Sequence, residues 1–116
     1  MKFVSAVFLS LGLSATPVYA ECLLGDEPTI PDGATSSYDD MIAAKGEVDA
    51  YMAVSNDFLS CLESENEAAI DGMDKDAAAE MTAAMAEKHN AAVEMQEKVA
   101  GAFNQAIRDY KAANPQ

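Results

Sequence analysis

The stretch that decides the fold is residues 37–75, which read SYDDMIAAKGEVDAYMAVSNDFLSCLESENEAAIDGMDK. Ser37 stands three residues before an aspartate, as Ser36 does, which is a capping-box pattern for a helix start. Apolar or small residues then recur about every 3.5 positions, the period of an α-helix and not of a strand. They are Met41, Ala44, Val48, Tyr51/Met52, Ser55, Leu59, Leu62 and Ala69/Ile70. Gly72 breaks the run, and Asp74 can cap a second helix. We therefore expect a helix over 37–70 and a turn over 71–74.

A second helical stripe lies beyond this turn. Its members are Met81, Met85, Lys88, Ala92, Met95, Val99, Phe103, Ala106 and Tyr110. Asn114-Pro115 ends the pattern, so we expect a helix over 75–113. Two long helices joined by a short turn form an antiparallel hairpin, and no segment has the period of a strand. The predicted fold class is all-α, an antiparallel two-helix hairpin. Lys88 interrupts the stripe; either its ammonium reaches solvent or an acid of the first helix, or it sets the register of a bundle.

Residues 1–20 have the pattern of a secretory signal peptide. One lysine precedes an apolar run at 3–13, and small residues lead to a cut after Ala20. The run is too short to span a bilayer, so we expect no stable membrane insertion after the signal is removed. The alternatives are a retained N-terminal anchor and a lipoprotein, and Glu21 before Cys22 argues against the latter. The expected location is the periplasm or the exterior.

The mature chain begins with an extended arm, residues 21–36, which is rich in proline and glycine. Cys22 of this arm and Cys61 are the only cysteines, and in an exported chain we expect them to form a disulfide. Because Cys61 lies off the main stripe, the bond would hold the arm along the outside of the first helix, with Leu23 and Leu24 against it. Closing that loop contributes about 4 kcal/mol. The alternatives are an intermolecular bridge and a redox or metal thiol, although no Cys-x-x-Cys is present.

The charge is strongly acidic, with 20 Asp and Glu against 7 Lys and Arg and a net charge of −13. Removing the signal with its one lysine makes the charge more negative. Such a surface disfavours nucleic acid and anionic lipid, and it suits a basic partner, cations or simple solubility. Two helices alone bury little apolar area. We therefore expect the arm, a homodimer or an envelope protein partner to cover the rest of the stripe.

One constellation could carry chemistry. Met81, Met85 and His89 succeed each other at four-residue steps on one helix face, and thioether and imidazole ligands suit Cu(I). The competing interpretation is that the methionines fill the hairpin core. No other cofactor is expected. His89 is the only histidine and both cysteines are expected to be paired, so a nucleophile–base set is missing and we expect no enzyme.

Several short segments, spread over most of the mature chain, form a recognisable set. They are Cys22, Pro28-Thr29-Ile30-Pro31-Asp32-Gly33, Met41, Tyr51, Asp57-Phe58-Leu59-Ser60-Cys61-Leu62, Asn90-Ala91-Ala92-Val93 and Phe103-Asn104. This set resembles a family of small exported bacterial helical proteins with no established function. The resemblance implies paired cysteines and two helices, and it supplies no catalytic or ligand residues.

The sequence thus predicts an exported interaction or structural protein that acts through a Met/Ala-rich helical face. One alternative is a copper-binding protein that uses Met81, Met85 and His89. The other is a small periplasmic hairpin with chaperone-like activity, which would require a large exposed apolar area.

Overall fold

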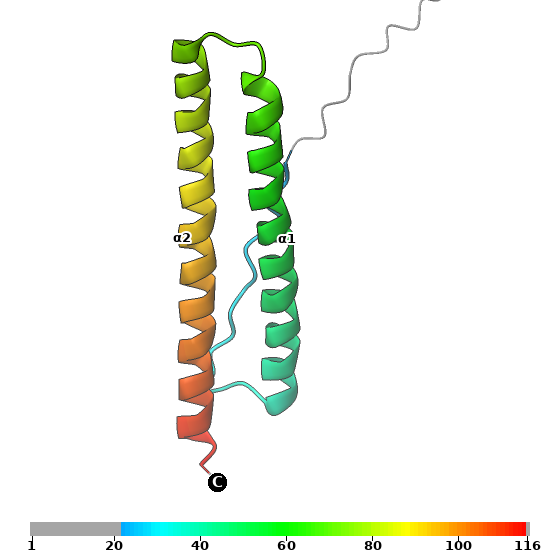
Figure 1. Ribbon diagram of the computed structural model, residues 1–116. Coiled ribbons are helices and arrows are strands. Elements are labelled where there is room, and N and C mark those ends of the chain that lie inside the picture. The colour runs from blue at the N-terminus through cyan, green and yellow to red at the C-terminus, as the bar shows by residue number, and fades with distance from the viewer. Residues whose placement is uncertain (1–21, 116) are drawn as a thin grey trace, which may run out of the picture.

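The computed structural model describes residues 22–115, which form two long antiparallel helices and an N-terminal arm (Figure 1). Helix α1 runs over Tyr38–Ile70 and helix α2 over Lys75–Ala113, which confirms the predicted all-α hairpin. No helix within the described residues is long and apolar enough to cross a membrane. The signal peptide predicted for residues 1–20 and its cut after Ala20 lie outside the described residues.

A capping box sets the start of α1. The Ser37 hydroxyl accepts a hydrogen bond from the Asp40 N–H at 3.1 Å, and the Asp40 carboxylate accepts one from the Ser37 N–H at 3.1 Å. Of the two candidate serines, Ser36 has a different role, because its hydroxyl donates to the Asp32 carbonyl at 2.7 Å. The acidic first turn also suits the positive end of the helix dipole.

A tight turn joins the two helices. Gly72 has φ +78°, a left-handed conformation that glycine adopts without strain, and the Met73 N–H donates to the Ile70 carbonyl at 3.1 Å. The Asp74 carboxylate then accepts from the Ala77 N–H at 2.8 Å and caps α2. These residues were expected to end one helix and begin the next, and the structure confirms both roles.

The core is the seam between the two helices. Its buried residues are Met41, Ala44, Val48, Tyr51, Ser55 and Leu62 of α1 and Ala92, Val99 and Ala106 of α2. The three buried residues of α2 stand seven apart, the repeat that keeps one face against a nearly antiparallel neighbour. Lys88 is exposed, so its charge reaches solvent from the edge of the seam. The stripe of α2 is therefore covered largely by α1.

Polar side chains also cross the seam. Ser55 is fully buried, and its hydroxyl accepts a hydrogen bond at 2.9 Å from the amide of Gln96, which donates to Asn56 at 2.9 Å as well. Nearer the turn, Asn66 and Thr82 bond each other at 3.3 Å. A buried hydroxyl without a partner is costly, so these contacts favour one register of the two helices.

The arm lies over the groove between the helices and contacts both of them. Ile30 packs on the central cluster of Val48, Tyr51 and Val99, to which α1 and α2 both contribute. The Glu27 carboxylate lies 3.3 Å from the Lys98 ammonium of α2. The arm was expected to lie along the outside of the first helix, and this expectation is incomplete, because the arm also contacts α2 (Figure 1). The alternative that the arm covers part of the stripe is confirmed at Ile30. The physical reason is that Ile30 buries more apolar surface in a groove with two walls than on one helix face.

The closest contact of the arm with α2 is at Gly33, which is buried. A Cβ on this residue would lie 2.7 Å from the carbonyl carbon of Ala106 and closer still to its oxygen. Only glycine permits this approach of two backbones. A turn at Asp32 places Gly33 against α2. The Asp32 carboxylate accepts a hydrogen bond from the Ala34 N–H at 3.0 Å, and the Asp32 carbonyl accepts one from the Thr35 N–H at 3.2 Å. The arm then returns to α1.

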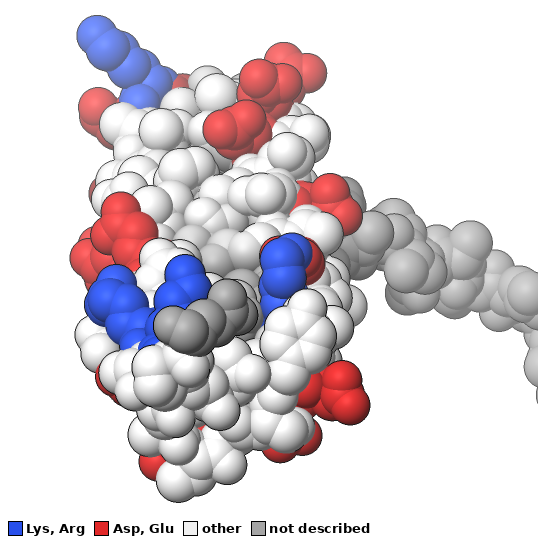
Figure 2. Space-filling model, turned by 90° about the horizontal axis from the view of Figure 1, so that it is seen from below, with Lys and Arg blue, Asp and Glu red and all other residues white. Residues whose placement is uncertain are grey.

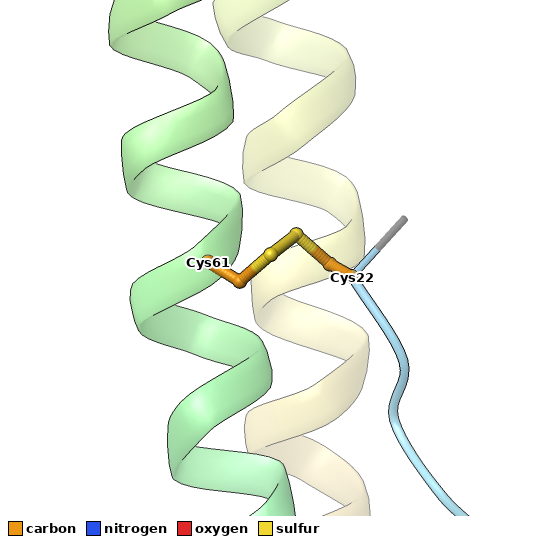
Figure 3. Close-up of a disulfide and its surroundings, with 2 residues drawn as sticks. All are labelled: Cys22 and Cys61. Atoms are coloured by element: carbon orange, nitrogen blue, oxygen red, sulfur yellow. A yellow bond between two sulfur atoms is a disulfide. The ribbon is translucent and has the colours of Figure 1, made fainter. Parts of the chain in front are cut away.

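A disulfide anchors the other end of the arm. Cys22 is bonded to Cys61 of α1, with their Cα atoms 5.6 Å apart (Figure 3). The predicted pairing is confirmed, and it is intramolecular. Leu24 is half-buried beside it, but Leu23 is 74 % exposed, so the expectation that both leucines pack against α1 holds for Leu24 alone.

Candidate binding cleft at the open end of the hairpin

The structure places only some of the predicted copper ligands in one pocket. Met81, Met85 and His89 are all located on α2, where the two methionines are half-buried and the histidine lies among them on the same face. Met85 and His89 line a shallow pocket of about 230 Å³ near the turn, together with Leu62 of α1, whereas Met81 lies outside its lining. The structure therefore brings two of the three candidate ligands to one pocket.

The disulfide has an acidic neighbour. A carboxylate oxygen of Glu65 and the sulfur atoms of Cys22 and Cys61 all lie within 4.8 Å of one another. Metal ions bind cysteine as the thiolate, and both sulfurs here are joined to each other. The two cysteines therefore have a structural role here. The alternative that they are metal-binding thiols does not apply to the disulfide-bonded protein.

A concave surface lies at the end of the hairpin farthest from the turn. We call it the end cleft, and its volume is about 830 Å³. The start of α1 and the end of α2 form its walls. Its lining residues are Tyr38, Met41, Ile42, Lys45, Phe103, Ile107, Tyr110, Lys111, Asn114 and Pro115. This volume falls within the range of about 300–1,000 Å³ that is typical of small-molecule sites.

The end cleft lies on the side of the seam opposite the arm. The arm covers the side of α1 that carries Val54, which with Tyr51 lines a hollow beneath Gly25 and Pro28. Lys45 of the end cleft is nine residues from Val54. At about 100° per residue, that separation puts the two side chains on opposite sides of α1. The arm therefore fills one groove of the hairpin and leaves the other open.

The floor and walls of the end cleft are apolar. Met41 is buried at its floor, and Phe103, Ile107 and Tyr110 of α2 are half-buried. Ile42 is 51 % exposed. Tyr38, at the mouth, is 64 % exposed. Large apolar side chains that share one concave surface and face water are typical of a binding site, whereas single exposed ones are common on any protein.

The charge at the end cleft has the opposite sign to the rest of the chain. Its described lining contains Lys45 and Lys111 and no carboxylate, although the chain has 20 Asp and Glu. Figure 2 looks at this end and shows Lys and Arg side chains near its centre, with Asp and Glu side chains around its edges. Lys45 also contacts Asp49 at 2.6 Å, but both side chains are more than half exposed, and such surface pairs are weak and exchangeable.

The end of α2 is held in shape by Asn114. Its backbone N–H and its side-chain amide both donate to the Tyr110 carbonyl, each at 2.9 Å. These bonds satisfy a carbonyl that would otherwise be free at the helix terminus. They hold Lys111 in the last turn of a closed helix, where a cation also suits the negative end of the dipole.

One ionisable group is perturbed on the arm side. Burial raises the pKa of Tyr51 above its ordinary value of 10.0; the Glu27 carboxylate raises it further, and the Lys98 ammonium lowers it. This tyrosine belongs to the core cluster beneath the arm and not to the end cleft.

The end cleft is a site that the sequence did not predict. Ile42 lies off the stripe of α1 and in the sequence resembles an isolated surface residue, whereas Ile107, four residues after Phe103, borders the stripe of α2. The signal that could have found them is their pairing across the hairpin, at the start of one helix and the end of the other. Comparisons with protein-family models, with curated proteins and with solved structures found no match for this chain.

Proposed function

We propose that this chain is an exported interaction protein and that its binding surface is the end cleft. The single observation that carries the proposal is the concave apolar surface that Ile42, Tyr38 and the residues of α2 opposite them form at one end of the hairpin, where it is open to water. No buried nucleophile or paired acid and base lies among its described lining residues, so its chemistry is that of binding.

We propose the end cleft in place of the Met/Ala-rich helical face that the sequence favours. The Met/Ala stripe of α2 packs against α1, and its residues Ala92, Val99 and Ala106 are buried. A partner can reach that stripe only at its edges. Two of the exposed large apolar side chains, Tyr38 and Ile42, share the end cleft, whereas Leu23, Val54 and Met73 lie elsewhere on the surface.

Export to the periplasm or the exterior is part of the same proposal. The signal-like residues 1–20 and the intramolecular Cys22–Cys61 disulfide support it, since structural disulfides persist in oxidising compartments. The partner would then be a component of the cell envelope, a second copy of the chain or a small molecule found there.

Photocrosslinking from the cleft tests the proposal. A photoreactive amino acid replaces Ile42 in one variant and Met73 in another, because Met73 is also exposed (40 %) but lies in the turn at the far end. After irradiation in cells that produce the protein, intact mass spectrometry should show a discrete adduct at position 42 that Ile107→Asp abolishes. Equal labelling at both positions, or none at position 42, would overturn the proposal.

Copper binding is a second candidate, because Met85 and His89 line the same pocket. Titration with Cu(I) under a non-thiol reductant tests it. Affinity should fall at least about tenfold in Met85→Leu if that thioether is a ligand. An unchanged affinity would remove the candidate.

The chaperone-like alternative stays a prediction, and suppression of client aggregation that depends on Ile42 would support it.

A further inference from the structure

We infer that the end cleft binds a single-chain amphipathic carboxylate, a ligand of the fatty-acid class. The inference rests on the proposed function and names the ligand of that site. Two features carry it: an apolar trough formed by Ile42, Phe103 and Ile107, and two ammonium groups, those of Lys45 and Lys111, along the same lining.

The two lysines contrast with the charge of the whole chain. A chain with a net charge of −13 repels anions over most of its surface and attracts cations. The described lining of the end cleft carries two lysines and no Asp or Glu. These lysines attract a carboxylate, so the anionic end of a ligand has a favourable place to lie beside the apolar trough. Lys45 can exchange its exposed Asp49 partner for that ligand at little cost.

The apolar trough suits an alkyl chain better than a peptide. Its walls are the side chains of two helices, whose backbone N–H and C=O groups are already bonded within the helices. A peptide laid in the trough would find few partners for its own backbone groups, and leaving them unpaired is costly. An alkyl chain has no such groups. It also fits within a volume of about 830 Å³.

Charge on the ligand head gives the sharpest test. Binding of dodecanoate, dodecan-1-ol and dodecyltrimethylammonium to the mature protein is measured by isothermal titration calorimetry at low salt, below their micelle concentrations. The chain length is the same in all three. The end cleft predicts that dodecanoate binds about tenfold more tightly than the cationic amphiphile, against the trend set by the net charge of the protein. Equal affinities, or tighter binding of the cation, would overturn the inference.

Matched charge variants locate the site. Lys111→Glu removes a cation from the lining, whereas Lys75→Glu makes the same change in net charge at the first residue of α2, near the turn. We expect Lys111→Glu to weaken dodecanoate binding about tenfold and Lys75→Glu to change it less than about twofold. Equal weakening in the two variants would show that net charge governs binding and would refute the site.

A variant that disrupts the apolar trough completes the design. Ile42→Asp places a carboxylate within the trough at an exposed position, where the fold tolerates it, and circular dichroism confirms the helix content of each variant. Binding of dodecanoate and dodecan-1-ol should both be lost. If the photoreactive variant at position 42 gives a discrete adduct while dodecanoate does not bind, the proposed function stands and this ligand class is wrong. If neither is observed, both fall.

Discussion

Replacing Gly33 by alanine tests whether the arm is seated on α2. The added Cβ would lie 2.7 Å from the carbonyl carbon of Ala106 and 3.0 Å from its Cα, where ordinary contacts begin near 3.4 Å. Both obstacles are backbone atoms of a helix, so no side-chain rotation relieves the overlap. The arm must move away from α2, and overpacking of this kind costs about 1–3 kcal/mol.

The cost has an upper bound set by the arm itself. If Gly33 lifts off entirely, Ile30 leaves the cluster of Val48, Tyr51 and Val99, and exposing one such side chain costs about 1.5–3 kcal/mol. The disulfide at Cys22 still tethers the arm, so the remainder of the hairpin persists. We therefore expect Gly33→Ala to lower the free energy of unfolding by about 2 kcal/mol.

Urea unfolding monitored by circular dichroism measures this loss, and the chain offers a control of opposite sign. Gly46 lies within α1, and a Cβ there meets nothing within 4 Å. Gly46→Ala should raise the free energy of unfolding by about 0.5–1 kcal/mol, since alanine favours the helix. If Gly33→Ala also stabilised the protein or left the midpoint unchanged, the contact between the arm and α2 would be refuted.

Three further outcomes can be measured in the same unfolding assay. Changing Cys22 and Cys61 together to serine should cost about 4 kcal/mol, because the closed loop spans a sequence separation of 39; an unchanged midpoint would contradict a structural role for the bond. Ser55→Ala should cost about 1 kcal/mol by removing the buried acceptor of Gln96, whereas Ser60→Ala, at an exposed position of α1, should change little; equal effects would refute the buried bond. Tyr51 gives a pH dependence: its pKa is raised in the folded state, so its contribution is complete below the ordinary value of 10.0 and is lost as the pH rises through the raised folded pKa. Tyr51→Phe should therefore lose less stability than the wild type between about pH 9 and pH 11, and an identical loss would show that this tyrosine does not titrate as described.

The helices were predictable because their determinants are local. The period of Met41, Val48 and Ser55 and the cap at Ser37 act within one helix, and these signals need no knowledge of the partner. The disulfide was equally accessible, since a chain with two cysteines has a single possible intramolecular pairing.

The path of the arm could not be predicted in full. Cys61 defines where the arm begins on α1, but nothing in its spacing shows that Ile30 also reaches Val99 or that Gly33 approaches Ala106. Those contacts depend on the distance between the two helices. For that reason the sequence alone predicts Ile30 and Gly33 only as residues of an extended arm, without their contacts to α2.

The end cleft is hidden in the sequence for a related reason. Ile42 lies well off the main stripe of its helix, where a single apolar residue carries no signal. It becomes part of a site because the hairpin brings Ile107 and Tyr110, near the end of α2, opposite it. Likewise Gln96 resembles an ordinary surface residue in the sequence, and only the fold places Ser55 within reach of its amide.

Backbone amide NMR with dodecanoate tests the central claim most directly, because it reports where a ligand lies. The claim is that the arm fills one groove of the hairpin and that the opposite end cleft is the binding surface. We expect saturable shift changes grouped at Ile42, Ile107 and Lys111, with little change at Ile30 and Gly33. Shifts centred on the arm, or none at saturating ligand, would contradict the claim.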